Sequence, residues 1–532
     1  MTLGDTGNVA GHGGEDERLK QYKNVAKHED MRRRRTECSV EIRKQKRDDM
    51  MMKRRQVVDD DESDDALTTD HDVSADNTEA KAAAAAARQP LMSFQQVVAV
   101  LSNNPSVEDM QRCFESVRRT LSRSKAPPID ETIENGVLNA LVQALGVEDD
   151  KVRFESAWSI TNIVSGTSRQ TLAAVQAGAI APLIHLMVSP NLQLAEQCLW
   201  AVANIAGDSS QMRDLVLQHN GLQALMYLAT IMDRLEVSFV RTIAWSFSNM
   251  CRHKNPNASL EVLRELAKGL SFLLQHTDKA VRQDACWAVS YLTDGPDEQI
   301  QLAVDANLLQ YVMPMLTESE SLAAPALRVL GNMATGNDQL TQHVIDIGTL
   351  QLISDLIQRS KSTTIVKECC WLISNVIAGT QDQIQHVIDA GLLPHIFQVL
   401  DTGDFKCQFE ASWAIANLAQ GGTSQQIFHL WSDGAVGPMC RALKIRNTDI
   451  LVNVLDSFYA LLTNVCTVEA GQLDLLRELI EEHSGLDNLE GLQENESEKI
   501  YSLAYKIIHE FFSEDEDYPN ESHNDENQPY AF

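Results

Sequence analysis

From about residue 91 to residue 512, apolar residues recur three and four positions apart. In the stretch 154–164, Phe-Glu-Ser-Ala-Trp-Ser-Ile-Thr-Asn-Ile-Val, positions 157, 160, 163 and 164 fall on one face of a helix that turns about 100° per residue. The stretches 199–206 and 370–377 repeat this pattern. The pattern predicts successive helices joined by short turns, with glycines between them at positions 136, 178, 221, 348, 391 and 434.

A short phrase, Trp-x-x-x-Asn, recurs within these predicted helices. Successive copies begin 42, 45, 42, 41, 43 and 42 residues apart. A period in the low forties without a strand pattern is typical of armadillo or HEAT repeats. We therefore predict an all-α armadillo-repeat superhelical solenoid of about ten repeats, with a basic N-terminal arm and disordered termini. The complete copies are Trp158/Asn162, Trp200/Asn204, Trp245/Asn249, Trp371/Asn375 and Trp413/Asn417, and between the third and fourth the phrase changes to Trp287/Tyr291 and Arg328/Asn332.

The two residues of the phrase lie beside the apolar stripe of each helix. Trp158 lies about 100° and Asn162 about 140° from Ala157, on the side away from Ile160 and Ile163. In a single repeat, a core tryptophan and a capping asparagine would explain the pair equally well. Five copies on one face favour a ladder along one surface of the stacked repeats.

Such a ladder suits an extended peptide rich in lysine and arginine. Asparagine offers both a donor and an acceptor, so it can hold the N–H and C=O of a peptide backbone. Indole faces between the amides can hold long alkyl stems and attract their cationic heads, at about 0.5–2 kcal/mol per contact. We therefore expect a groove for a basic peptide.

The charge of the chain is divided between a basic arm and an acidic body. The formal net charge is −30. Residues 18–55 hold 15 Lys/Arg and 6 Asp/Glu, a net of +9, and the rest of the chain has a net of −39. Residues 59–79 add ten acids without a single lysine or arginine. This balance argues against nucleic acid as the principal ligand and predicts that arm and body attract each other.

We find no sequence pattern for a cofactor, a metal or a membrane. The ten cysteines show no C-x-x-C or zinc spacing, and the glycine-rich start carries no phosphate-binding lysine. The chain opens with no signal peptide, and no apolar run reaches about 18 residues. We expect a soluble intracellular protein with reduced cysteines.

Several segments resemble the importin alpha family of nuclear import adaptors: 155–167, 203–208, 291–296 and 381–385. The resemblance runs from about Arg18 to about Ser513. It implies an adaptor that binds the Lys/Arg-rich nuclear localisation signals of cargo, links them to importin beta and moves between cytoplasm and nucleus. It also implies that an export receptor grips the C-terminal repeat, at 473–512.

The resemblance divides the chain into five segments. Residues 1–17 would be disordered, 18–56 would bind importin beta, 57–90 would form a flexible linker, 91–512 the repeats, and 513–532 a disordered acidic tail. Within the second segment, Lys53, Arg54 and Arg55 match the cluster that mimics a cargo signal in the family. This cluster would then inhibit cargo binding from within the chain.

The resemblance also implies two peptide-binding grooves, each with a set of site residues. Arg328 stands in a tryptophan position, where it would repel a cation and separate the grooves. The larger groove would comprise Trp158, Asn162, Gly166, Thr171, Gln197, Trp200, Asn204, Asp208, Trp245, Asn249 and Asp284. The smaller groove would comprise Arg328, Asn332, Glu368, Trp371, Asn375, Glu410, Trp413 and Asn417.

Two other classes of protein fit the sequence less well. An armadillo scaffold in signalling or cell junctions would share the solenoid, but such scaffolds usually line their groove with basic residues, whereas this body is acidic. An enzyme could use Cys369 or Cys370 as its nucleophile, but no His/Asp constellation accompanies them. We therefore expect an adaptor and not an enzyme.

Overall fold

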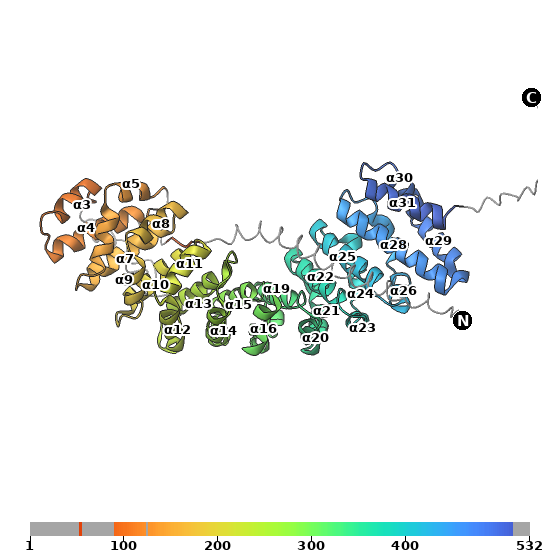
Figure 1. The fold of residues 1–532 in the computed structure, drawn as a ribbon, viewed down its shortest axis with the longest axis horizontal. Helices are drawn as coiled ribbons and strands as arrows, with labels where there is room; N and C mark the ends of the chain where they lie inside the picture. The colour runs from red at the N-terminus through yellow and green to blue at the C-terminus, as the bar shows by residue number, and fades with distance from the viewer. Residues whose placement is uncertain (1–52, 56–89, 124–125, 514–532) are drawn as a thin grey trace, which may run out of the picture. The chain divides into compact units, whose positions relative to one another are not determined.

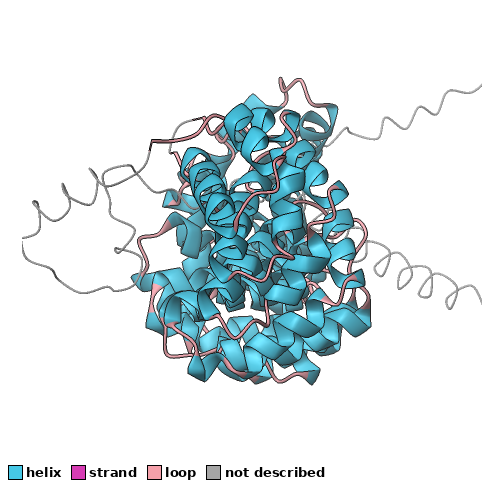
Figure 2. Ribbon diagram, turned by 90° about the vertical axis from the view of Figure 1, so that its left-hand side faces the viewer, coloured by secondary structure: helices cyan, strands magenta, loops and turns pink. Residues whose placement is uncertain are grey.

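The computed structural model describes residues 53–55, 90–123 and 126–513, and within these ranges it contains helices and turns but no strand (Figures 1 and 2). The prediction of an all-α chain of repeated helices is confirmed. Our predictions for residues 1–17, most of the basic arm, nearly all of the linker and the acidic tail concern segments outside the described residues.

The described helices fall into two compact units that divide after Leu352. The helix α21 (Thr349–Arg359) spans this division. The first unit contains α3 (Phe94–Leu101), α4 (Val107–Leu121), α5 (Ile129–Glu134), α6 (Val137–Ala144), α7 (Asp150–Val164), α8 (Ser168–Gln176), α9 (Ile180–Leu186), α10 (Leu192–Ala206), α11 (Ser210–Gln218), α12 (Gly221–Thr230), α13 (Val237–Arg252), α14 (Leu260–Leu273), α15 (Lys279–Leu292), α16 (Asp297–Asp305), α17 (Leu309–Val312), α18 (Met315–Glu318), α19 (Glu320–Met333) and α20 (Asp338–Asp346).

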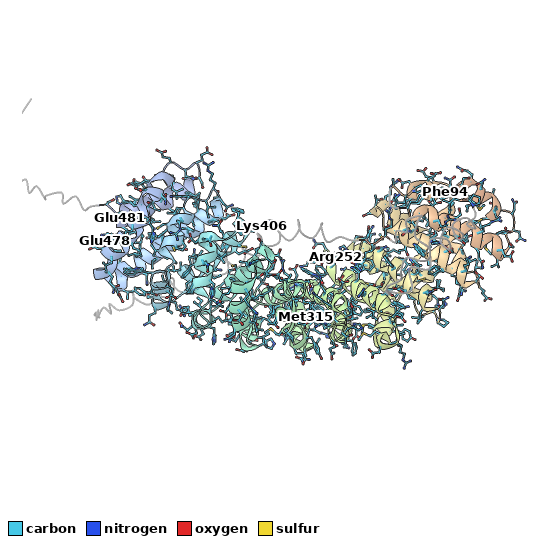
Figure 3. The ribbon with its side chains drawn as sticks, turned by 180° about the vertical axis from the view of Figure 1, so that it is seen from behind. Phe94, Arg252, Met315, Lys406, Glu478 and Glu481 are labelled. Atoms are coloured by element: carbon cyan, nitrogen blue, oxygen red, sulfur yellow. The ribbon has the colours of Figure 1, made fainter. Side chains whose placement is uncertain are left out.

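The second unit continues the same pattern. Its last helices are amphipathic: α29 buries Leu476 and Ile480 and exposes Glu478 and Glu481 (Figure 3). The unit contains α22 (Thr363–Ile377), α23 (Gln381–Asp389), α24 (Leu393–Thr402), α25 (Phe405–Gly421), α26 (Ser424–Ser432), α27 (Val436–Ala442), α28 (Thr448–Val468), α29 (Leu473–Glu482), α30 (Gly485–Leu492) and α31 (Glu498–Phe511).

One long helix ends each repeat and is called the third helix below. The complete Trp-x-x-x-Asn phrase lies on α7, α10, α13, α22 and α25, and its altered forms lie on α15 and α19. In the first unit the third helices, α4, α7, α10, α13, α15 and α19, pack one against the next. In the second unit α22, α25, α28 and α31 do the same. The helix α28 is long and apolar enough to cross a membrane by length and composition, yet 61% of its apolar window is buried inside the protein.

The predicted apolar stripe forms the core, but four of the five tryptophans of the complete phrases are more deeply buried than we expected, and only Trp200 is half-buried. Ala157, Ile160 and Ile163 are fully buried. Trp158 is only 3% exposed, and the ladder asparagines are at most 2% exposed. Neighbouring third helices lie against each other and cover these side chains, so the phrase belongs to the packing as well as to the surface.

Each ladder asparagine for which this bond is seen also ties its helix to the repeat before it. The Nδ2 of Asn249 donates to the backbone oxygen of Ala203 at 2.9 Å. The Nδ2 of Asn417 likewise donates to the oxygen of Ser374 at 2.8 Å. In these bonds the backbone acceptor lies one residue before the preceding ladder position, so the hydrogen bond keeps the ladder in register. Equivalent bonds join Asn204 to Thr161 and Asn332 to Ser290.

A glycine and a glutamine recur together in the turns after α7, α15 and α22. In the second unit, the N–H of Thr380 donates to Gln383 Oε1 at 3.0 Å, and the Gln383 N–H donates back to Thr380 Oγ1 at 3.3 Å. This reciprocal capping box starts α23. A Cβ atom on Gly379 would lie 1.9 Å from Gln383 Oε1, so only glycine leaves room for the glutamine.

We predict that Gly379→Ala lowers the free energy of unfolding by about 1 kcal/mol, since the added methyl group displaces the capping glutamine. Gly471→Ala is the matched control, because a Cβ atom there meets nothing within 4 Å. Thermal unfolding followed by circular dichroism should show a lower midpoint for the first variant alone. Equal midpoints would contradict this account of the turn.

Candidate peptide-binding groove

Trp200 and Asn204, one complete copy of the phrase, bind the backbone of Arg54 in the chain's own basic segment. Asn204 Oδ1 accepts from the backbone N–H of Arg54 at 3.0 Å, and Asn204 Nδ2 donates to the Arg54 carbonyl oxygen at 3.0 Å. The indole Nε1 of Trp200 donates to the same oxygen at 2.9 Å. All three contacts are to backbone atoms, so any extended peptide could make them.

The ammonium of Lys53 lies among three oxygen acceptors. It donates to the Gly166 carbonyl oxygen at 3.0 Å and to Thr171 Oγ1 at 2.8 Å, and it pairs with the Asp208 carboxylate. These groups come from the turn after α7, from α8 and from the turn after α10. A lysine ammonium is compact and carries three donors, so this arrangement suits it.

The guanidinium of Arg54 lies between an aromatic ring and a carboxylate. Its central carbon is 4.7 Å from the centre of the Trp245 ring, and its NH2 lies 3.3 Å from Asp284 Oδ2. Burial raises the pKa of the Asp284 carboxyl, and the neighbouring Arg54 opposes that rise. A cation in this slot therefore favours the ionised form of Asp284.

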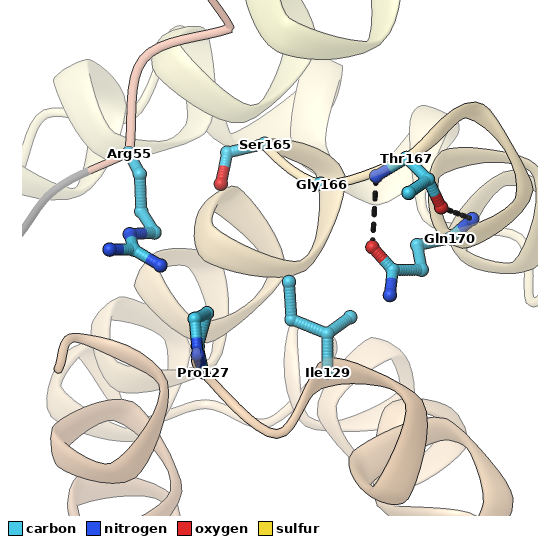
Figure 4. A pocket seen from close by; sticks show the side chains of 7 residues that line it. All are labelled: Arg55, Pro127, Ile129, Ser165, Gly166, Thr167 and Gln170. Carbon is cyan, nitrogen blue, oxygen red and sulfur yellow. Dashed lines mark hydrogen bonds between the residues drawn. The ribbon is translucent and has the colours of Figure 1, made fainter. Parts of the chain in front are cut away.

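Arg55 lines a cavity of about 450 Å³ (Figure 4). The other lining residues are Pro127, Ile129, Ser165, Gly166, Thr167 and Gln170, which include no carboxylate. Sequence analysis identified Gly166 among these residues but neither Pro127 nor Ile129. They precede the phrase by about thirty residues and reach the groove only through the stacking of repeats.

The remaining residues of the predicted larger groove lie on α7, α10 and α13, around the occupied position: Trp158, Asn162, Gln197 and Asn249. Gln197 Nε2 donates to Thr161 Oγ1 at 2.8 Å. Trp158 Nε1 and Asn249 Oδ1 are buried and have no hydrogen-bond partner within the described part of the chain. They lie in the repeats before and after Asn204, at the positions where a longer peptide would continue.

The predicted smaller groove is divided between the two units. Arg328 and Asn332 lie on α19 of the first unit, and the other six residues lie on α22 and α25 of the second. In the second unit, Glu368 pairs with Lys367 at 2.7 Å, and both side chains are buried. Sequence analysis did not identify Lys367, which directly precedes the predicted carboxylate. Among the described atoms, Trp413 Nε1 and Asn417 Oδ1 are buried without a hydrogen-bond partner.

The two cysteines considered as nucleophiles lie in the core. Cys369 and Cys370 are fully buried, and burial raises the pKa of both thiols. A protonated thiol is a poor nucleophile. Among the described residues, no group of three or more His, Cys, Asp or Glu side chains could hold a metal ion.

Comparison with known proteins identifies the basic arm and the helical repeats as known domains. Residues 18–113 match the importin beta binding domain, and residues 125–165, 167–207, 337–378 and 380–420 match the armadillo/beta-catenin-like repeat. Residues 475–528 match an atypical Arm repeat. A crystal structure of an engineered protein matches with a TM-score of 0.70 at 22% identity, over 79% of this chain and 100% of its own, which supports the fold.

Two named relatives carry the family assignment. Importin subunit alpha-2 of Caenorhabditis elegans is 56% identical and covers 96% of this chain and 95% of its own length. Importin subunit alpha-3 of Arabidopsis thaliana is 35% identical over 96% of this chain and 94% of its own. The alternative of a signalling or junction scaffold is not favoured. The chain therefore belongs to the importin alpha family and is a nuclear import adaptor, with an importin beta binding domain ahead of its armadillo repeats.

Proposed function

We propose that the larger groove holds the basic signal of a cargo protein in extended form, and that Lys53, Arg54 and Arg55 compete with that signal from within the chain. The contact that carries this proposal is the double hydrogen bond between Asn204 and the backbone of Arg54. This double hydrogen bond involves only backbone atoms of the bound segment. Cargo and internal segment would therefore make the same contact and exclude each other.

Tethering favours the internal segment. Residues 56–89 join it to the repeats, and a flexible chain of that length spans about 30 Å. The effective concentration of the internal segment at the groove is then on the order of millimolar. Even an intrinsic dissociation constant on the order of micromolar would therefore keep the groove occupied. Importin beta, by binding residues 18–50, would draw the segment away. Carrier and cargo would then strengthen each other's binding by about 1–3 kcal/mol, by the same factor in both directions.

The rest of the chain has complementary roles in this proposal. The smaller groove takes the second, shorter basic cluster of a bipartite signal, through Trp371, Asn375, Trp413 and Asn417. The repeat at 473–512 binds the export receptor, which returns the adaptor from the nucleus to the cytoplasm. The chain acts without a cofactor, without catalysis, and without binding nucleic acid or membrane.

We predict that replacing Lys53, Arg54 and Arg55 by alanine strengthens binding of a basic peptide in the absence of importin beta, since the internal competitor is removed. Fluorescence anisotropy should also show that importin beta no longer improves peptide binding to this variant. Replacing Arg33, Arg34 and Arg35 by alanine removes the same charge and serves as the control. If the two triple variants bind the peptide equally, the segment is not an internal competitor.

We predict that Trp200→Ala combined with Asn204→Ala weakens binding of a monopartite Lys-Lys-x-Lys peptide by more than about 1 kcal/mol. An indole wall and a backbone clamp are lost together. Both changes should be made in the chain that lacks the internal basic cluster. The equivalent pair in the smaller groove, Trp371→Ala with Asn375→Ala, should leave this peptide's affinity within about twofold. Unchanged affinity in the first variant would rule out this groove.

We predict that the affinity for an arginine-containing peptide falls as the pH is lowered from 7 towards 5. The folded-state pKa of Asp284 is raised by burial, so protonation begins above the ordinary range of an aspartate and removes the charge that attracts the guanidinium. Peptide binding is thus stronger on the high-pH side of that pKa. The Asp284→Asn variant should bind more weakly at pH 7 and with a smaller pH dependence. If the Asp284→Asn variant and the chain with Asp284 show the same pH profile of peptide binding, Asp284 does not have this role.

A further inference from the structure

The ladder extends one repeat beyond Trp158, where its residues change character. Forty residues before Trp158 and Asn162 lie Arg118 and Ser122. Asn162 Nδ2 donates to Ser122 Oγ at 3.1 Å, across the packed helices α4 and α7. This contact keeps the two helices in the ladder register. Arg118 therefore occupies the place that tryptophan holds in the following three repeats.

Arg118 makes the same combination of contacts that Arg54 makes further along the groove. Its guanidinium carbon lies 4.5 Å from the centre of the Trp158 ring, and its Nε donates to Glu155 Oε2 at 2.5 Å. Arg118 is 3% exposed and Glu155 is 5% exposed. Burial raises the pKa of Glu155, and Arg118 opposes that rise. An indole face and a buried carboxylate thus already hold a cation, supplied by the chain itself.

The direction of the bound segment determines which peptide residue would come near Arg118. Arg54 lies at Asn204, and Arg55 lines the cavity formed in part by Pro127 and Ile129. The segment therefore runs towards the first repeat as its residue numbers increase. Side chains alternate along an extended chain, so every second residue faces the same way. The residue two positions after the one held by Asn204 would reach Trp158, and the residue four positions after it would face Arg118.

We propose that Arg118 ends the cation-selective part of the groove by filling, from within the chain, a slot for lysine or arginine formed by Trp158 and Glu155. This proposal rests on the proposed function of the larger groove. Arg118 is then a specificity-determining residue: a signal gains affinity from basic side chains only as far as Trp158. Beyond that point an added lysine or arginine finds its slot occupied.

A purely structural role for the pair makes a different prediction. A buried arginine and glutamate can simply join α4 to α7, and removing one partner would then lower stability without creating a new preference. A slot that is filled internally would instead become available when Arg118 is shortened. The gain of a new binding preference distinguishes the two roles.

The test compares two peptides that differ at a single position. Both carry the same basic core, and the residue four positions after the one expected at Asn204 is lysine in one and alanine in the other. In the full-length chain with Lys53, Arg54 and Arg55 replaced by alanine, we expect the two affinities to agree within about twofold. In the same chain carrying Arg118→Ala, the lysine peptide should bind about threefold or more tightly than the alanine peptide, because a cation over an indole face is attractive.

Two further variants serve as controls. Arg118→Lys keeps a cation near the slot and should show no preference between the peptides. Arg118→Ala combined with Glu155→Gln removes the carboxylate and should abolish most of the gain. Two outcomes overturn the proposal. One is that the chain with Arg118 intact already binds the lysine peptide more tightly than the alanine peptide. The other is that a folded Arg118→Ala variant binds both peptides equally.

If circular dichroism shows that Arg118→Ala does not fold, the two peptides are compared on the chain with Arg118 intact. Equal affinities then support the proposal, and tighter binding of the lysine peptide overturns it. If neither peptide binds at all, the proposed function of the groove fails together with this inference. If both bind and only the position dependence is wrong, the groove stands and the role of Arg118 falls.

Discussion

The side-chain amide of the ladder asparagine connects the stacking of the repeats to the binding of the chain's own basic segment. Its nitrogen donates to a backbone oxygen of the preceding repeat, as Asn249 does to Ala203. Its oxygen is left for an N–H outside the helices, as Asn204 Oδ1 accepts from Arg54. An amide can serve both purposes because it carries donors and an acceptor at opposite corners. The hydrogen bond that aligns the repeats therefore also orients the acceptor that a ligand needs.

The slot that holds Arg54 depends on burial as much as on charge. Asp284 lies partly out of water, where burial raises the pKa of its carboxyl, and a guanidinium beside it compensates for that cost. The indole of Trp245 covers the other side of the same guanidinium. Such a slot favours a cation with a long alkyl stem over a small ion, because the stem replaces water along the ring. The acidic charge of the body adds a longer-range attraction that salt weakens.

The chain uses its own cations in several of these places. Lys53 and Arg54 lie in slots that suit a basic ligand, Arg118 covers Trp158, and Lys367 pairs with Glu368. These cations differ in how they are attached. Arg118 and Lys367 lie within packed helices, whereas Lys53 and Arg54 belong to a segment outside the repeats. Because Lys53 and Arg54 lie outside the packed helices, their segment can leave these slots while the repeats stay folded.

Much of the fold could be predicted from the sequence because its information is local and repeated. The 3.6-residue periodicity predicts each helix, the period near 42 predicts the solenoid, and the apolar stripe at Ala157, Ile160 and Ile163 is buried as expected. The Trp-x-x-x-Asn phrase likewise identified Trp200 and Asn204, which hold the backbone of Arg54. The charge asymmetry predicted that arm and body attract each other.

Tertiary structure decided how each of these residues is used. It buries Trp158 beneath Arg118, commits one half of each bonded asparagine to the neighbouring repeat, and brings Pro127 and Ile129 to the cavity beside Arg55. None of these contacts follows from the pattern of one helix, because each joins groups that are 40 to 74 residues apart in the sequence. A periodic sequence determines which face a residue occupies. Whether a neighbouring repeat covers that face or leaves it for a ligand depends on how the helices pack.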